Sequence, residues 1–278
     1  MRVLRVVVGM LSLVIASTSL TALSAEAQTY VLPKDAKRIE AAMSRLGLPV
    51  GKVDGIWDND TARATCAWRE LTGRDVWRGW PVVAERPSVK ATTALTPTSA
   101  MRVGMNINIA CQTGIWVDSA LVETSSVRTR TVVITLPPDT STVTDTATAS
   151  ETGTVTGETT TVVETYTVTK LVRERQVLRV VPVSTGRVGV YDTHLGSFRV
   201  QWAVDKWWQS TIYTDGLMYR PFFFNGGQAL HGSITDALVM WYPASHGCVR
   251  MLHKDIDALW KAGFGRGDRV YVYGTWKS

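Results

Sequence analysis

The chain has 278 residues, a length that fits one large domain or two modest ones. Hydrophobic residues make up 45% of it and charged residues 19%, a globular balance that excludes a wholly disordered chain. The formal net charge of +6 suits an acidic environment, but no cluster of Lys and Arg indicates nucleic-acid binding. No interior run stays apolar over about 18 residues, the length that a membrane-spanning helix needs.

Residues 1–27 have the pattern of an export signal. Arg2 and Arg5 precede a short apolar segment, and Ala25-Glu26-Ala27 fits a signal-peptidase cleavage site. We therefore expect the mature chain to begin at Gln28, in an oxidising compartment outside the cytoplasm, with no stable membrane anchor. The alternative is an uncleaved anchor, which the shortness of the apolar segment does not favour.

Residues 33–80 are predicted to form a small helical domain. Ile39 and Met43 recur at helical spacing, and Gly47 is placed to end that helix. Asn59 or Asp60 can cap a second helix.

A motif links these two helices. Asp54, Gly55, Trp57 and Thr61 follow one another in an order that resembles the peptidoglycan-binding-like helical domain. The resemblance implies glycan binding, and the alternative is a helical spacer without a ligand.

Residues 81–101 are rich in Pro, Thr and Ala and are predicted to form a linker. Strands are expected over 105–116 and 175–183. Between them, residues 123–169 contain 18 Thr and no Trp, Cys, His, Met or Phe, so this segment cannot fill a core and should be mobile or only locally β-like. We interpret it as an insertion in the loop of one β-hairpin, since loop closure costs little extra in a long loop. The alternative is a linker between two independent domains.

Two elements are predicted near the C-terminus. A helix is expected over 254–261, with Gly263 ending it, and a last strand over 269–273.

The densest group of reactive residues is Ser245-His246-Gly247-Cys248-Val249-Arg250, with His231-Gly232 upstream. A thiol needs a neighbouring base to become a nucleophile, and the nearby histidines can supply one. Consecutive amides beside a glycine can bind an oxyanion. This pattern favours a Cys/His acyl-transfer enzyme. The alternatives are a structural zinc site completed by His194 or His253, and an inert buried cysteine.

The segments His231-Gly-Ser and Ala244-Ser-His-Gly-Cys-Val-Arg-Met resemble the signature of the L,D-transpeptidase family, also called YkuD-like. Similarity covers about 105–117 and 171–274. The resemblance implies an α+β, mostly β fold, with a two-sheet, sandwich-like catalytic domain over 102–276 behind the small helical domain. The Thr-rich insertion, 123–169, lies outside the family pattern.

The resemblance also implies residue roles. Cys248 is the nucleophile, His231 is the general base, and the Gly232 carbonyl orients the imidazole. The amides of Gly247 and Cys248 form the oxyanion hole, and His246 and Ser245 shape its wall. The expected substrate contacts are Ser245, Arg250 and Tyr219. No cofactor or metal is implied.

The implied function is peptidoglycan remodelling in the periplasm or cell wall, with stem peptides and glycan as partners. The cysteine attacks the L,D bond before the terminal D-Ala of a tetrapeptide stem and forms a thioester. An amine of a second stem then takes the acyl group. The alternatives are a hydrolase or L,D-carboxypeptidase that uses water as the acceptor, and a non-catalytic wall-binding protein.

The cysteine count predicts one disulfide. With Cys248 required as a free thiol in an exported chain, Cys66 and Cys111 are left to pair. Such a bond fastens the helical domain to the first strand of the catalytic domain. The alternative is that both are small buried thiols.

Overall fold

The computed structural model describes residues 33–79, 95–135, 159–214 and 216–277. The predicted export signal and most of the predicted linker therefore lie outside the described residues. Within the described ranges, no helix is long and apolar enough to cross a membrane.

The N-terminal unit contains the two predicted helices. Its elements are the 3-10 helix η1 (Pro33–Asp35), α1 (Ala36–Arg45) and α2 (Asn59–Leu71). Gly47 follows α1 with a φ of 77°, the left-handed conformation that commonly ends a helix. The expected cap of α2 is wrong, because the helix begins at Asn59 and the capping residue is Asp58. The Asp58 carboxylate accepts hydrogen bonds from the amides of Asp60 and Thr61, each at 2.9 Å.

The expected single strand over 105–116 is in fact two strands joined by a turn. β1 (Gly104–Asn108) pairs antiparallel with the start of β2 (Thr113–Thr135), so that Gly104 lies opposite Val117. The chain reverses at Gln112, whose φ is 53°. Because apolar residues alternate on both sides of the turn, the sequence pattern did not reveal the reversal.

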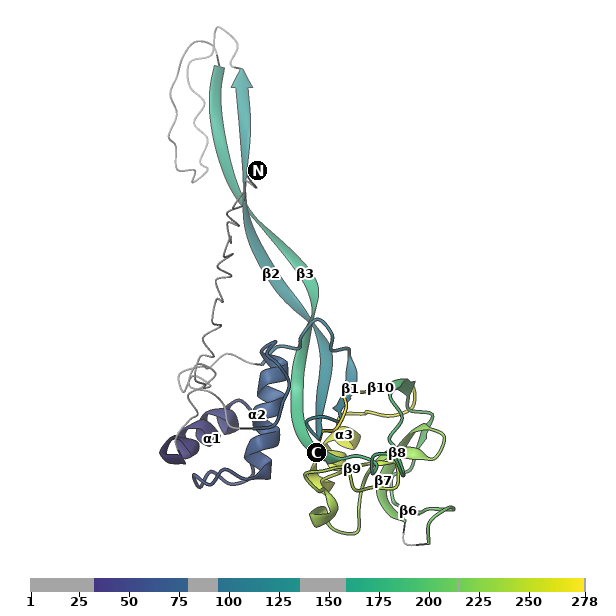
Figure 1. The fold of residues 1–278 in the computed structure, drawn as a ribbon. Coiled ribbons are helices and arrows are strands. Elements are labelled where there is room, and N and C mark those ends of the chain that lie inside the picture. Colours follow the sequence, from purple (N-terminus) through teal and green to yellow (C-terminus); the bar gives the residue numbers. More distant parts are fainter. Residues whose placement is uncertain (1–32, 80–94, 136–158, 215, 278) are drawn as a thin grey trace, which may run out of the picture.

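β2 and β3 (Thr159–Ser184) form one long antiparallel ladder, from Thr113 opposite Pro182 to Thr135 opposite Thr159. The hairpin interpretation is thus confirmed, and the linker between independent domains is contradicted. Figure 1 shows the two strands leaving the body as a twisted ribbon. The described parts of the Thr-rich segment are regular strands rather than mobile chain. Thr and Val favour extended backbone, and the ladder satisfies the backbone hydrogen bonds without a core.

The remaining elements complete a mostly β domain. They are β4 (Gly196–Arg199), β5 (Trp202–Ala203), β6 (Trp207–Gln209), β7 (Leu217–Asn225), β8 (Gln228–Gly232), η3 (Asp236–Leu238), β9 (Val249–Met251), α3 (His253–Lys261) and β10 (Arg269–Tyr273). The predicted last strand is confirmed, and the predicted helix begins one residue earlier than expected.

These strands form one mixed sheet in the order β4-β10-β1-β2-β3-β9-β8-β7-β5, with β6 on β7. β3 pairs with β2 along most of its length and with β9 at its end, so it joins the two halves of the sheet. One buried cluster collects side chains from both halves and from α3, among them Met105, Val270, Phe222, Leu230 and Ile256. The two halves therefore pack on a common core, which is the sandwich-like arrangement expected.

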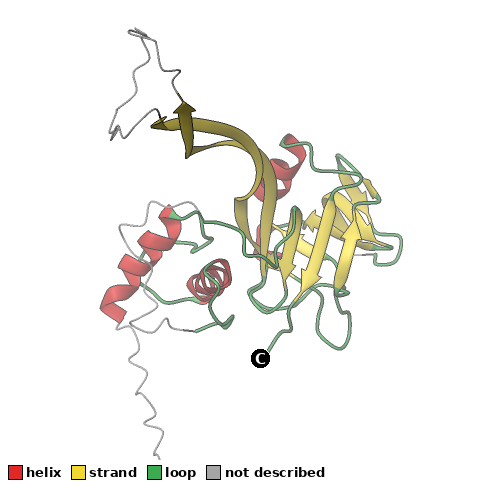
Figure 2. Ribbon diagram, turned by 90° about the horizontal axis from the view of Figure 1, so that it is seen from above, coloured by secondary structure: helices red, strands yellow, loops and turns green. Residues whose placement is uncertain are grey.

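The helical unit packs on the base of the ribbon. Ile39, Met43 and Trp68 share a buried cluster with Ile115 and Val180 of the ribbon strands. Figure 2 shows α1 and α2 on one side of the ribbon base and the other strands on the opposite side.

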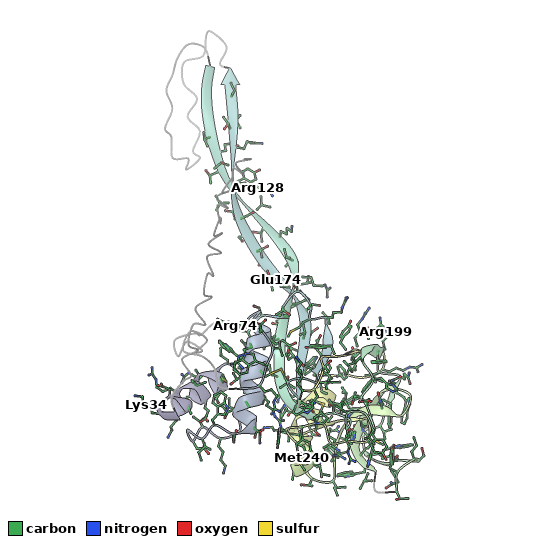
Figure 3. All side chains as sticks on the ribbon, viewed as in Figure 1. Lys34, Arg74, Arg128, Glu174, Arg199 and Met240 are labelled. Carbon is green, nitrogen blue, oxygen red and sulfur yellow. A yellow bond between two sulfur atoms is a disulfide. The ribbon has the colours of Figure 1, made fainter. Side chains whose placement is uncertain are left out.

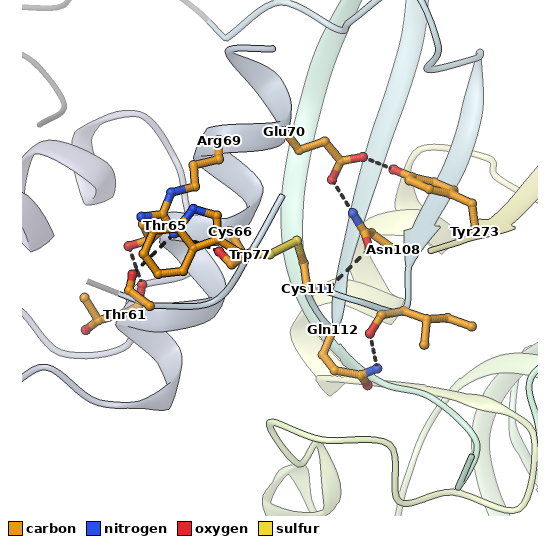
Figure 4. Close-up of a disulfide and its surroundings, with 12 residues drawn as sticks. Thr61, Thr65, Cys66, Arg69, Glu70, Trp77, Asn108, Cys111, Gln112 and Tyr273 are labelled. Carbon is orange, nitrogen blue, oxygen red and sulfur yellow. Dashed lines mark hydrogen bonds between the residues drawn. A yellow bond between two sulfur atoms is a disulfide. The ribbon is translucent and has the colours of Figure 1, made fainter. Parts of the chain in front are cut away.

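A disulfide joins Cys66 of α2 to Cys111, with Cα atoms 5.5 Å apart, as predicted (Figure 4). Cys111 lies in the turn between β1 and β2, not on the expected strand. Beside the disulfide, the Glu70 carboxylate accepts hydrogen bonds from the Asn108 amide, at 2.8 Å, and from the Tyr273 hydroxyl. Burial raises the pKa of Glu70. The helical unit is thus held to the catalytic body by a covalent bond and a buried polar contact.

Candidate active site

The sheet register brings the two halves of the reactive motif together. β8 and β9 pair in parallel, with His231 opposite Arg250 and Leu230 opposite Val249. Cys248 immediately precedes β9, one step before the Leu230–Val249 pair, so it lies two residues from His231 along the strand pair and on the same face. Cys248 and His231 line one cavity of about 380 Å³. Other residues lining this cavity include Tyr213, Gln228, Ser233, Ser245, His246 and Arg250.

The His231 ring is buried and held in one orientation. Its Nδ1 lies 2.8 Å from the carbonyl oxygen of Gly232, the partner expected from the sequence. A carbonyl can only accept, so Nδ1 carries the proton and Nε2 of the neutral ring keeps its lone pair. Burial, with a smaller contribution from the positive charge of Arg250, lowers the pKa of His231 to about 4. The imidazole is therefore a neutral base at physiological pH.

The Cys248 thiol is the free cysteine of the described residues and is partly exposed. Its Sγ donates to the carbonyl of Gly227 at 3.6 Å. Burial raises the pKa of Cys248, while a hydrogen bond from the Ala229 backbone and the charge of Arg250 act in the opposite direction. A thiol with a raised pKa stays protonated until a base takes its proton, and the neutral imidazole of His231 lines the same cavity.

Ser245 shapes the turn that presents Cys248. Its hydroxyl donates to the Cys248 carbonyl. The same hydroxyl oxygen accepts from the Gly247 amide at 3.1 Å. Gly247 has a φ of 105°, which a residue with a side chain adopts only under strain. The Gly247 amide, expected in the oxyanion hole, is therefore already engaged by Ser245.

Two tyrosines that the sequence did not single out enclose His246. The His246 ring stacks on Tyr213 with centroids 4.6 Å apart and meets Tyr191 edge-on at 4.7 Å. Both tyrosines lie in loops without any motif, so no periodicity or spacing pointed to them. They fix the ring of His246 as one wall of the cavity.

Tyr219 lies behind the site rather than in it. It is absent from the cavity lining, and its hydroxyl donates to Asp257 at 2.9 Å. Its ring packs on His253, on the far side of Gly232. A Cβ on Gly232 would lie 2.5 Å from the His253 ring, so the backbone must be glycine there. Of the three expected substrate contacts, Ser245 and Arg250 line the cavity and Tyr219 does not, and its substrate contact stays a prediction.

The two fourth ligands considered for a zinc site are bound elsewhere. His253 Nε2 lies 2.6 Å from the Ser233 carbonyl, and His194 Nδ1 lies 2.9 Å from the Asn225 amide. Across the described ranges, no group of three or more His, Cys, Asp or Glu side chains is placed to hold a metal ion.

The helical motif builds the helical unit itself. The Glu40 carboxylate accepts from the Gly55 amide at 2.8 Å and from the Thr61 hydroxyl at 3.2 Å. Trp57 packs against the cluster between the helices and the ribbon. These contacts give Gly55, Trp57 and Thr61 a structural role within the helical unit.

A free cysteine just before β9 and an oriented histidine on β8 line one cavity of a mostly β domain, and cysteine acyl-transfer enzymes use this pair of residue types. Residues 158–272 match the family model of YkuD, the L,D-transpeptidase catalytic domain. The match begins inside the Thr-rich segment and leaves out β1, whereas the expected similarity began at 105.

No curated protein matches the chain. Among solved structures, an L,D-transpeptidase from Xylanimonas cellulosilytica is 21% identical with a TM-score of 0.48, covering 88% of this chain and 96% of that one. An L,D-transpeptidase from Stackebrandtia nassauensis is 17% identical with a TM-score of 0.39, covering 87% and 92%. One from Mycobacterium tuberculosis is 20% identical with a TM-score of 0.31, covering 38% and 52%.

Proposed function

We propose that this chain is an exported peptidoglycan L,D-transpeptidase with Cys248 as nucleophile and His231 as general base. The observation that carries the proposal is the shared cavity of the two side chains, with the Nδ1 proton of His231 directed at Gly232. The match of residues 158–272 to the L,D-transpeptidase catalytic domain supports the same activity.

The proposed reaction begins with a proton transfer from Cys248 Sγ to Nε2 of His231. The sulfur then attacks the carbonyl carbon of the bond before the terminal D-Ala of a tetrapeptide stem. The Cys248 amide stabilises the oxyanion, since the Gly247 amide is engaged by Ser245. D-Ala leaves as an amine that takes the proton back from His231, and a thioester remains on Cys248.

In the second half, the side-chain amine of another stem loses a proton to His231 and attacks the thioester carbonyl. The new amide links the two stems, and the Cys248 thiol is regenerated with the proton from His231. The positive charge of Arg250 faces this cavity and suits the carboxylate end of a stem peptide.

The test is acylation of the thiol. After incubation with a carbapenem, which acylates enzymes of this family, mass spectrometry should find one adduct on Cys248. Cys248→Ala should give none, and His231→Ala should slow acylation by about 100-fold or more, the usual value of general-base assistance. Full acylation of either variant would rule out the Cys/His mechanism.

The acceptor is tested separately. Incubation with disaccharide-tetrapeptides should give dimers joined through the third residues of two stems. Free tripeptides without dimers would instead favour the hydrolase or carboxypeptidase alternative. An absence of any product would favour a non-catalytic wall-binding protein.

We also propose that the helical unit holds the enzyme near glycan strands in the periplasm or cell wall. A pull-down of the purified chain with insoluble peptidoglycan tests this. The solvent-exposed Ile56, at 65% exposure, belongs to the loop between the helices. Ile56→Asp should weaken retention, and unchanged retention would show that this loop is not the contact.

A further inference from the structure

The ribbon has an outer edge without a partner. Within the described residues, β3 pairs with β2 over Thr159–Pro182 and with β9 only at Val183 and Ser184. An unpaired edge of this length presents a row of backbone N–H and C=O groups that can pair with another strand. Figure 3 shows side chains projecting from both faces of the ribbon, with Arg128 and Glu174 labelled.

One face of the ribbon exposes aliphatic side chains among Thr, Ser and charged residues. Residues directly opposite in the ladder share a face, and so do alternate residues along each strand. The odd-numbered face carries five aliphatic side chains that are more than half exposed, Leu121, Val127, Val133, Val163 and Leu171. A two-stranded ribbon is marginally stable alone, and additional strands stabilise it.

The sequence of the β3 edge is complementary to itself about Thr167. The mirrored pairs are Tyr166 with Val168, Thr165 with Thr169, Glu164 with Lys170, Val163 with Leu171, and Val162 with Val172. In an antiparallel pairing around a twofold axis at Thr167, each residue faces its mirror residue in the other copy. Each pair joins residues of one face, so opposite charges meet and aliphatic side chains meet.

We propose that this edge is a homodimerisation surface, where β3 strands of two copies pair antiparallel over 162–172. The interface is isologous, and it joins the two ribbons into one four-stranded sheet. Pro182 is the last residue of β3 that pairs with β2, at the foot of the ribbon. It lies 15 residues from Thr167, a distance of about 50 Å along the strand at the usual rise per residue. The two catalytic bodies therefore lie at opposite ends of the sheet and do not collide. This inference is independent of the proposed function.

A charge swap tests the register. Sedimentation velocity of the purified chain over a range of concentrations should show a monomer–dimer equilibrium. Glu164→Lys or Lys170→Glu places two like-charged pairs in the interface. Either variant should raise the dissociation constant of the dimer by about tenfold or more. The double variant restores both pairs with exchanged signs and should recover dimerisation. Arg130→Gln is the matched control, because it removes only the 2.6 Å pair between Arg130 and Glu164 within one chain.

A cross-link tests the same axis directly. Opposite Cα atoms of antiparallel strands lie about 4.5–5.5 Å apart, within disulfide range. In a Cys248→Ala background, Thr167→Cys should therefore give a covalent dimer under mild oxidation. Thr165→Cys should not, because its two copies lie about 13 Å apart along the paired strands. A wild-type chain that stays monomeric, a swap that does not restore pairing, or equal cross-linking at both positions would overturn the proposal.

Discussion

Gln112 is the residue whose replacement tests how the nucleophile turn is held. Its buried side chain accepts from the Thr185 amide at 2.8 Å and donates to the Thr185 hydroxyl and the Ile109 carbonyl, each also at 2.8 Å. The Thr185 carbonyl in turn accepts from the amides of Ala244 and Ser245, at 2.8 and 3.0 Å. One side chain thus connects the β1–β2 turn to the residues that precede Cys248.

Gln112→Ala is expected to reduce both stability and acylation. The variant leaves the Thr185 amide and hydroxyl buried without their partner, at about 1–3 kcal/mol each, so a loss of about 2–6 kcal/mol in the free energy of unfolding is expected. Because Thr185 carries the strand end that holds Ser245, the Cys248 turn shifts as well. A displacement of about 1 Å at the reacting atom slows a reaction by about 100-fold.

The measurements are urea unfolding and stopped-flow acylation by a carbapenem, taken where each variant is fully folded. Gln112→Glu provides a rescue, because its carboxylate still accepts from the Thr185 amide. Its second oxygen accepts from the Thr185 hydroxyl, reversing the wild-type bond, but opposes the Ile109 carbonyl. It should fall between Gln112→Ala and wild type in both assays. Gln176→Ala, on the exposed ribbon, is the control and should change neither. Wild-type stability and acylation in Gln112→Ala would refute the role assigned to this side chain.

Three further predictions concern the base, the disulfide and the ribbon. Because His231 stays neutral above its lowered pKa of about 4, the rate of carbapenem acylation should fall in acid with a midpoint near pH 4. A midpoint near 6.5, the ordinary histidine value, would contradict this role of burial. The Cys66–Cys111 bond closes a loop with a sequence separation of 45, so the double variant Cys66→Ala/Cys111→Ala should lose about 4 kcal/mol in the free energy of unfolding, measured in urea. An unchanged urea midpoint would show that the disulfide does not stabilise the fold. Joining Val122 to Lys170 through a short Gly/Ser loop should leave a folded chain that is acylated at the wild-type rate, since none of the removed residues that the structure describes lines the cavity. An insoluble product would show that the Thr-rich segment is needed for folding.

The catalytic motif was predictable because its residues are close in the sequence or follow a known spacing. Cys248 and His231 could be paired from the resemblance, and the parallel register of β8 and β9 supplies the reason that they meet. The disulfide followed from counting cysteines in an exported chain. Helix ends such as Gly47 were predictable because glycine is favoured in the left-handed conformation.

The missed features depend on contacts between distant segments. Gln112 and Thr185 are 73 residues apart, and nothing in either local sequence indicates that they bond. The tyrosines around His246 belong to loops without periodic patterns. The turn at Gln112 escaped notice because a non-glycine residue takes the left-handed conformation there, supported by the amide of Cys111 bonding to the Asn108 side chain at 3.2 Å.

Some of the residues that hold the candidate active site in place lie outside the segment that matches the family model. Residues 158–272 include Cys248 and His231, but Gln112 precedes them in the chain. β1 also lies outside the match, although Met105 and Ile107 are buried in the core beneath the active-site strands. Cys111, next to Gln112, is covalently tied to the helical unit. The helical unit is thus connected, through the disulfide, Gln112 and Thr185, to the turn that presents the nucleophile. Reduction of the disulfide removes the covalent part of that connection and leaves the hydrogen bonds of Glu70 to Asn108 and Tyr273.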